Sequence, residues 1–136
     1  MKQKQQAKAK KIRVAIYARA RSLDQKGEDL QTKREDLESQ LQKCREVARK
    51  CGWEIVGEYA DFQTRGNNGK PKLEELANRA AQKGDFDKVL VFTLDRIGRK
   101  LWYYQTMLDH FKQHGAIVES TRDNYHRLVS LIPLIF

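Results

Sequence analysis

A short apolar run at residues 89–94, Val-Leu-Val-Phe-Thr-Leu, most constrains what this chain can fold into. β-Branched and aromatic residues without polar alternation are typical of a strand covered on both faces, as in parallel α/β sheets. The strand is expected over residues 88–94, and it delivers Asp95, Arg96 and Arg99 to its carboxyl end. Ligands of open α/β sheets bind at that edge, and arginine binds phosphate oxygens through paired hydrogen bonds. The run therefore predicts a phosphate site.

Strands and helices alternate along the rest of the chain. Strands are expected over residues 12–18, 53–60, 88–94 and 116–120, helices over 35–50, 73–84 and 101–114, and polar loops over 19–33 and 61–71. The helices are predicted from apolar residues that recur at three- and four-residue steps. This alternation predicts a three-layer α/β fold, with an open, mainly parallel sheet, helices on both faces and flavodoxin-like winding.

Two further arginines follow the first predicted strand. Arg19 and Arg21 stand at its carboxyl end. In either common strand order of such sheets, the ends of the first and third strands face one crevice. We therefore expect these arginines to lie near Asp95 and Arg96.

Length and charge bound the organisation of the chain. Its 136 residues suffice for one domain. We expect a basic flexible arm over residues 1–11, the α/β domain over 12–121, and an apolar tail over 122–136. The tail either lies on the core or is disordered, or it is exposed and drives association. The 27 Lys and Arg against 18 Asp and Glu give a net charge of +9, which favours a polyanion such as nucleic acid. The alternative is that the charge serves solubility alone.

Cysteine and histidine patterns point away from disulfides and metals. Cys44 and Cys51 lie two turns apart on one predicted helix, too distant to bridge, and free thiols favour the cytoplasm. The three histidines, His110, His114 and His126, show no metal-ligand spacing, so no metal site is expected. The amino terminus lacks the apolar core of a secretory signal, and no stretch is long enough to span a membrane.

Five segments in order carry a family resemblance: residues 13–19 (Arg-Val-Ala-Ile-Tyr-Ala-Arg), 37–41, 52–56, 61–71 and 89–99. Together they resemble the N-terminal catalytic domain of serine recombinases of the resolvase/invertase family, over residues 13–120. The resemblance implies DNA cleavage and strand exchange through a phosphoserine linkage, as in DNA integration and the movement of mobile elements. It also implies no cofactor, the DNA backbone as partner, and a homo-oligomer, dimer or tetramer, in the intact family member.

The resemblance also implies site residues. The catalytic candidates are Ser22, Arg19, Asp95, Arg96, Arg99 and Lys70. The DNA-binding or supporting candidates are Tyr17, Arg21, Gln25, Gln40, Asp61 and Arg65. Lys70 stands where the family usually has an arginine, and lysine keeps the charge but loses the bidentate fork.

The serious departure is at the nucleophile. The family pattern is Tyr-x-Arg-Val-Ser, with a glutamine four residues beyond the serine. Counting from Arg19 or back from Gln25 places Arg21 at the serine position, with Ser22 one residue late. Either Ser22 acts through a local bulge, or the chain is catalytically dead, or the substitution belongs to a natural or engineered variant of an active parent. Phosphoryl attack needs close in-line geometry, so we expect impaired chemistry.

Three functions remain open at this point. The first is a recombinase catalytic domain, impaired and truncated, since family members continue into a long helix and a DNA-recognition domain. The second is a non-catalytic DNA-binding or interaction module, or mobile-element remnant, on the same fold. The third, an unrelated flavodoxin-like receiver domain, would need clustered acidic residues for Mg²⁺ rather than arginines. The aromatic run 102–104 is open to two readings as well, base stacking or core packing.

Overall fold

A parallel four-stranded sheet in the order β2-β1-β3-β4 forms the centre of the domain. The computed structural model describes residues 11–20, 30–62, 69–98 and 100–121. Its elements are β1 Arg13–Ala20, α2 Leu30–Cys51, β2 Glu54–Phe62, α3 Pro71–Gln82, β3 Lys88–Val91, a 3₁₀ turn Leu94–Arg96, α4 Leu101–Gln113 and β4 Ile117–Ser120. This architecture confirms the predicted α/β class with a parallel sheet.

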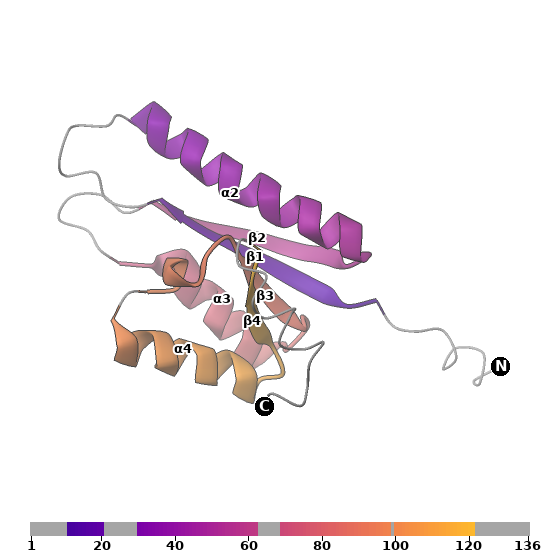
Figure 1. Ribbon diagram of the computed structural model, residues 1–136. Helices are drawn as coiled ribbons and strands as arrows, with labels where there is room; N and C mark the ends of the chain where they lie inside the picture. The colour runs from indigo at the N-terminus through magenta and orange to yellow at the C-terminus, as the bar shows by residue number, and fades with distance from the viewer. Residues whose placement is uncertain (1–10, 21–29, 63–68, 99, 122–136) are drawn as a thin grey trace, which may run out of the picture.

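Helices cover both faces of the sheet, as Figure 1 shows, with α2 on one side and α3 and α4 on the other. Alternation along β1 explains the two layers, because successive side chains of a strand point to opposite faces. Val14 and Ile16 pack against α2, whereas Ala15 and Tyr17 pack into the larger core beneath α3 and α4. The central strand β1 is buried from Val14 onward, so its carboxyl end emerges from the middle of the molecule.

The third strand is shorter than the sequence predicts. It ends at Val91, and Leu94–Arg96 forms a 3₁₀ turn instead of continuing the strand. Leu94 still packs against the core from this turn, which is why the apolar run extends beyond the strand. The prediction of a strand over residues 88–94 is therefore wrong at its carboxyl end.

Two other boundaries differ in ways that affect the site. Helix α2 begins at Leu30, not at residue 35, and β1 includes Arg19, so the predicted loop over 19–33 is too long at both ends. Strand β2 continues to Phe62, which places Asp61 in the sheet rather than in the predicted loop 61–71. Asp61 is paired in register with Arg19 of β1. Strand pairing fixes both residues where sequence pattern alone suggested polar loop.

Neither cysteine forms a disulfide, as their spacing predicts, and Cys44 is buried whereas Cys51 is exposed. Burial raises the pKa of the Cys44 thiol to about 12, so it behaves as an apolar core group. Within the described residues, no helix has the length and apolar character to cross a membrane.

Candidate active site

Arg19 is the first cationic side chain at the carboxyl edge of the sheet. It belongs to the last part of β1 and is 7% exposed. Its Nε donates to the main-chain carbonyl of Arg96 at 3.0 Å, and its Nη2 donates to that of Asp95 at 3.3 Å. The guanidinium of Arg19 is therefore hydrogen-bonded to the 3₁₀ turn after β3.

Gln40 of α2 fixes the main chain of Arg19. The Oε1 atom of Gln40 accepts from the Arg19 N–H at 3.2 Å, and its Nε2 donates to the Arg19 carbonyl at 3.1 Å. On this side β1 is paired with β3 only as far as Tyr17, because β3 ends at Val91. The buried amide of Gln40 thus supplies the hydrogen bonds that a longer β3 would make. The Nε2 atom of Gln40 also donates to the Asp36 carboxylate at 3.1 Å.

Asp95 and Arg96 lie on the 3₁₀ turn that replaces the end of the predicted strand. The carboxylate of Asp95 accepts a hydrogen bond from the hydroxyl of Thr93. The main-chain carbonyls of residues 95 and 96 accept the hydrogen bonds from Arg19.

The guanidinium of Arg96 is the unusual group of the site. Its Nε and Nη1 atoms are buried, and no hydrogen-bond acceptor for them occurs in the described part of the chain. Buried N–H groups without an acceptor are costly, about 1–3 kcal/mol each and more when charged. A guanidinium in this state suits a ligand that brings anionic oxygens, and a phosphate group does so with matching geometry.

Asp61 joins β2, β1 and α3. Its carboxylate accepts from the Tyr17 hydroxyl at 2.8 Å and from the main-chain N–H groups of Lys72 at 2.9 Å and Leu73 at 3.1 Å. The last two contacts cap the first turn of α3, where negative charge is favoured. Burial, and then the charge of Asp61, raises the pKa of Tyr17 far above its usual value, so the hydroxyl stays protonated and donates. Asp61 is thus a buried structural acceptor.

Lys70 lies beside this network, immediately before α3. Its ammonium is 4.5 Å from the centre of the Tyr103 ring. Burial lowers the pKa of Lys70 below its usual value, the positive charge of Arg19 lowers it further, and Asp61 and Glu74 oppose the shift. Lys70 and Arg19 are therefore close enough to interact electrostatically.

Tyr103 and Gly98 also lie at the site, next to Lys70, although residue type and spacing do not predict this. Tyr103 packs so closely on Gly98 that a Cβ at residue 98 would lie 2.7 Å from its Cδ2 atom. The available signal was the aromatic residue in the first turn after the Asp-Arg-Ile-Gly motif. Spacing alone could not separate this contact from ordinary core packing.

Several candidates fall outside the described residues: Arg21, Ser22, Gln25, Arg65 and Arg99. The described part of the chain holds no group of three or more potential metal ligands. His110, one of the histidines considered above, contacts the carbonyl of Ala77 through Nε2 at 2.9 Å.

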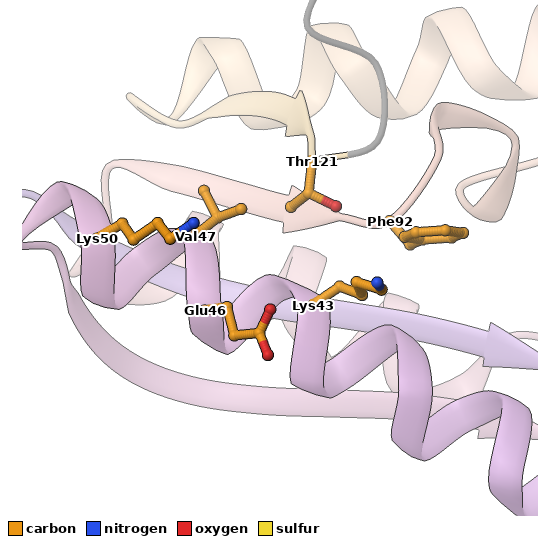
Figure 2. Close-up of a pocket in the computed structure, with 6 residues that line it drawn as sticks. All are labelled: Lys43, Glu46, Val47, Lys50, Phe92 and Thr121. Atoms are coloured by element: carbon orange, nitrogen blue, oxygen red, sulfur yellow. The ribbon is translucent and has the colours of Figure 1, made fainter.

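A pocket of about 350 Å³ lies on the α2 face of the sheet (Figure 2). It is lined by Lys43, Glu46, Val47, Lys50, Phe92 and Thr121. The first four come from α2, and the last two follow β3 and β4. Arg19 and Arg96 do not line it, so it is separate from the arginine site.

The structure thus combines a parallel α/β domain with the cationic side chains of Arg19, Lys70 and Arg96 near the carboxyl ends of its central strands. A family profile described as "Resolvase, N terminal domain" matches residues 14–129. The chain therefore belongs to the resolvase family of site-specific recombinases, and the matched region is the family's catalytic-type domain. This membership sets aside the receiver-domain alternative.

Solved structures agree with the family. The C-terminal catalytic domain of ISC1926 TnpA, an IS607-like serine recombinase, is 28% identical with a TM-score of 0.65, over 91% of this chain and 80% of that chain. The N-terminal catalytic domain of TP901-1 integrase is 26% identical with a TM-score of 0.64, over 90% and 89%. A resolvase family site-specific recombinase from Streptococcus pneumoniae, 24% identical with a TM-score of 0.69 over 92% and 87%, shares the fold. Comparison with curated protein sequences found no match.

Proposed function

We propose that this recombinase domain binds the DNA backbone at the carboxyl ends of β1 and β3, with a phosphate held by Arg96. The observation that carries the proposal is the buried Nε and Nη1 of Arg96, which lack an acceptor in the described residues. A phosphate oxygen would remove that unfavourable state. Lys70 adds a second cation, and the net charge of +9 favours association with DNA.

Arg19 has a positioning role in this proposal. Because its guanidinium binds the carbonyls of residues 95 and 96, it holds the turn that carries Arg96 against β1. Gln40 in turn fixes the main chain of Arg19. A rigid cationic frame of this kind stabilises charge on phosphoryl oxygens without reorganising, which is the main requirement of phosphoryl transfer.

The attacking group is the weak part of the site. In serine recombinase chemistry, a serine Oγ forms a bond to phosphorus while the bond to the leaving strand oxygen breaks. The serine loses its proton and the leaving oxygen gains one. The resulting phosphoserine ester conserves the energy of the broken phosphodiester bond, so rejoining the strand requires no cofactor. Here Arg21 occupies the serine position and Ser22 follows it. We propose that the chain binds DNA but cleaves it poorly.

A covalent-trapping experiment separates binding from chemistry. The chain is incubated with a nicked duplex that releases a short strand on cleavage, and adducts are resolved on a denaturing gel. We expect salt-sensitive binding and little adduct from the wild-type chain. Arg21→Ser should restore the adduct, because it returns a serine to the family position. An abundant wild-type adduct that disappears in Ser22→Ala would show that Ser22 attacks and that the chain is an active enzyme.

The phosphate site has its own control. Arg96→Ala should weaken binding to the nicked duplex at low salt. Arg49→Ala removes the same charge from the exposed last turn of α2, so it serves as the matched control. Equal affinities of the two variants would refute a specific phosphate site at Arg96. Binding without any adduct, even in Arg21→Ser, would favour the non-catalytic DNA-binding module.

Two coarser expectations belong to the same proposal. We propose that the chain self-associates on DNA, which sedimentation with and without duplex would test. We also propose a cytoplasmic location, which cell fractionation would test. The free thiols are compatible with the second point.

A further inference from the structure

Two large apolar side chains are exposed at the start of α4. Leu101 is 73% exposed and Trp102 is 67% exposed, the highest values among the large apolar residues that the structure describes. Other aromatic residues of the same helix are covered: Tyr103 and Tyr104 pack against the core, and Phe111 lies within it. An exposed tryptophan beside an exposed leucine marks a contact surface rather than core packing.

Side-chain contacts connect this surface to the phosphate site. The Trp102 ring meets the Tyr103 ring edge-on, with centroids 5.9 Å apart and an angle of 88°. Tyr103 in turn lies against Gly98 and beneath the ammonium of Lys70. In Figure 1 the first turns of α3 and α4 lie at the same end of the molecule as the carboxyl end of β1. The exposed Trp102 ring is therefore linked to Lys70 through Tyr103.

We propose that Trp102 stacks on a nucleobase of the DNA whose phosphate is held at Arg96. This inference rests on the proposed function. Base–aromatic stacking tolerates any sequence, because every base has a π-face, so it adds affinity without reading sequence. Leu101 would cover the edge of the stacked base.

Charge at the surface supports DNA as the occupant. The exposed Lys100 precedes α4, and the first turn of the helix has no acidic residue. Burial raises the pKa of Tyr103, and the charge of Glu74 on the neighbouring helix raises it further. The Lys70 ammonium lies against the same Tyr103 ring.

A second copy of the chain is the competing occupant. A stable protein interface buries about 800 Å² on each partner, with 20–30 residues on each side. Two adjacent side chains fall far short of this, whereas a single ring suffices to stack on one base. The size of the surface therefore favours a nucleobase.

Tryptophan fluorescence can observe this contact directly. The chain has two tryptophans. Trp53 directly precedes β2, at the amino ends of the strands, and the Lys88 ammonium lies 4.9 Å from the centre of its ring. A Trp53→Phe chain thus reports on Trp102 alone. The probe is a duplex with a two-nucleotide gap, and the matched control has abasic sites in the gap, which keep the phosphates and remove the bases. Trp102 emission should be quenched by the first DNA and little changed by the second.

Affinity gives an independent readout. Trp102→Leu should weaken binding to the gapped duplex by about tenfold, and binding to the abasic duplex by less than about twofold. Trp102→Phe should retain most of the affinity. Thermal unfolding of the exposed-site variants should match the parent, which separates lost contact from lost fold.

Three results would overturn the inference, and they have different meanings. If Trp102→Leu binds the gapped duplex like its parent while Arg96→Ala binds more weakly, only the stacking contact is refuted. If neither substitution weakens binding, the phosphate site fails as well. If Trp102 emission depends on protein concentration without DNA, and Trp102→Leu dissociates a dimer in sedimentation, the surface binds a second copy instead.

Discussion

Replacement of Asp61 by asparagine tests the finding that a buried carboxylate holds three elements together. The carboxylate accepts three hydrogen bonds, from the Tyr17 hydroxyl and from the main-chain N–H groups of Lys72 and Leu73. It is 3% exposed, so water cannot replace these acceptors. An asparagine amide has one oxygen, and its NH₂ group cannot accept. At least one of the three donors must therefore lose its partner.

The expected cost follows from two contributions. A buried donor left without an acceptor costs about 1–3 kcal/mol. Loss of negative charge at the first turn of α3 costs about 0.5–1 kcal/mol more. Asp61→Asn should therefore lower the free energy of unfolding by about 2–4 kcal/mol, which corresponds to a fall of roughly 1–2 M in the urea midpoint.

The assay is equilibrium urea unfolding followed by circular dichroism. Asp109→Asn, on the exposed side of α4, is the matched control and should change stability by less than about 0.5 kcal/mol. Tyr17→Phe removes one donor, so the asparagine oxygen can then turn toward the helix amides. Asp61→Asn should cost at least about 0.5 kcal/mol less in that background. A single variant as stable as the Asp109→Asn control would refute the role of Asp61 in holding α3.

Two other substitutions test the residues around the proposed phosphate site. Gln40→Leu leaves the buried N–H and C=O of Arg19 without partners, so the free energy of unfolding should fall by about 2–4 kcal/mol. The Arg19 amide should also lose hydrogen-exchange protection. Unchanged protection would show that Gln40 does not hold the main chain of Arg19. Lys70→Arg tests a pH effect. Because its pKa is lowered, Lys70 loses its charge at a lower pH than an ordinary lysine does. As the pH rises, the DNA affinity of the wild-type chain should therefore decline before that of the variant, whose arginine stays charged. Identical pH profiles between pH 7 and 10 would exclude Lys70 from the DNA contact.

Local pattern was sufficient for the order of the elements. The apolar steps of α2, α3 and α4 and the run before Asp95 predict a helix-covered parallel sheet. Gly52 and Gly115 end α2 and α4 with φ values of 73° and 86°, as expected of glycine after a helix. These features depend on residues that are close in the sequence, so they can be predicted from the sequence alone.

Boundaries at the site were misjudged because long-range contacts decide them. Leu94 is as apolar as a strand residue, yet it packs on the core from a 3₁₀ turn. Asp61 is as polar as a loop residue, yet it pairs with Arg19 in the sheet and caps α3. Periodicity cannot distinguish these cases, since the partners lie far away along the chain.

The sequence by itself determined the fold class, the edge of the sheet that carries the arginines, and the family resemblance, because all three follow from residue types and spacing. Only the tertiary structure decided which atoms of each arginine find a hydrogen-bond acceptor. The Nε and Nη2 atoms of Arg19 donate to main-chain carbonyls, whereas two buried N–H-bearing atoms of Arg96 have no acceptor in the described residues. Identical side chains differ in hydrogen bonding because the folded backbone determines which of them lie near a main-chain carbonyl.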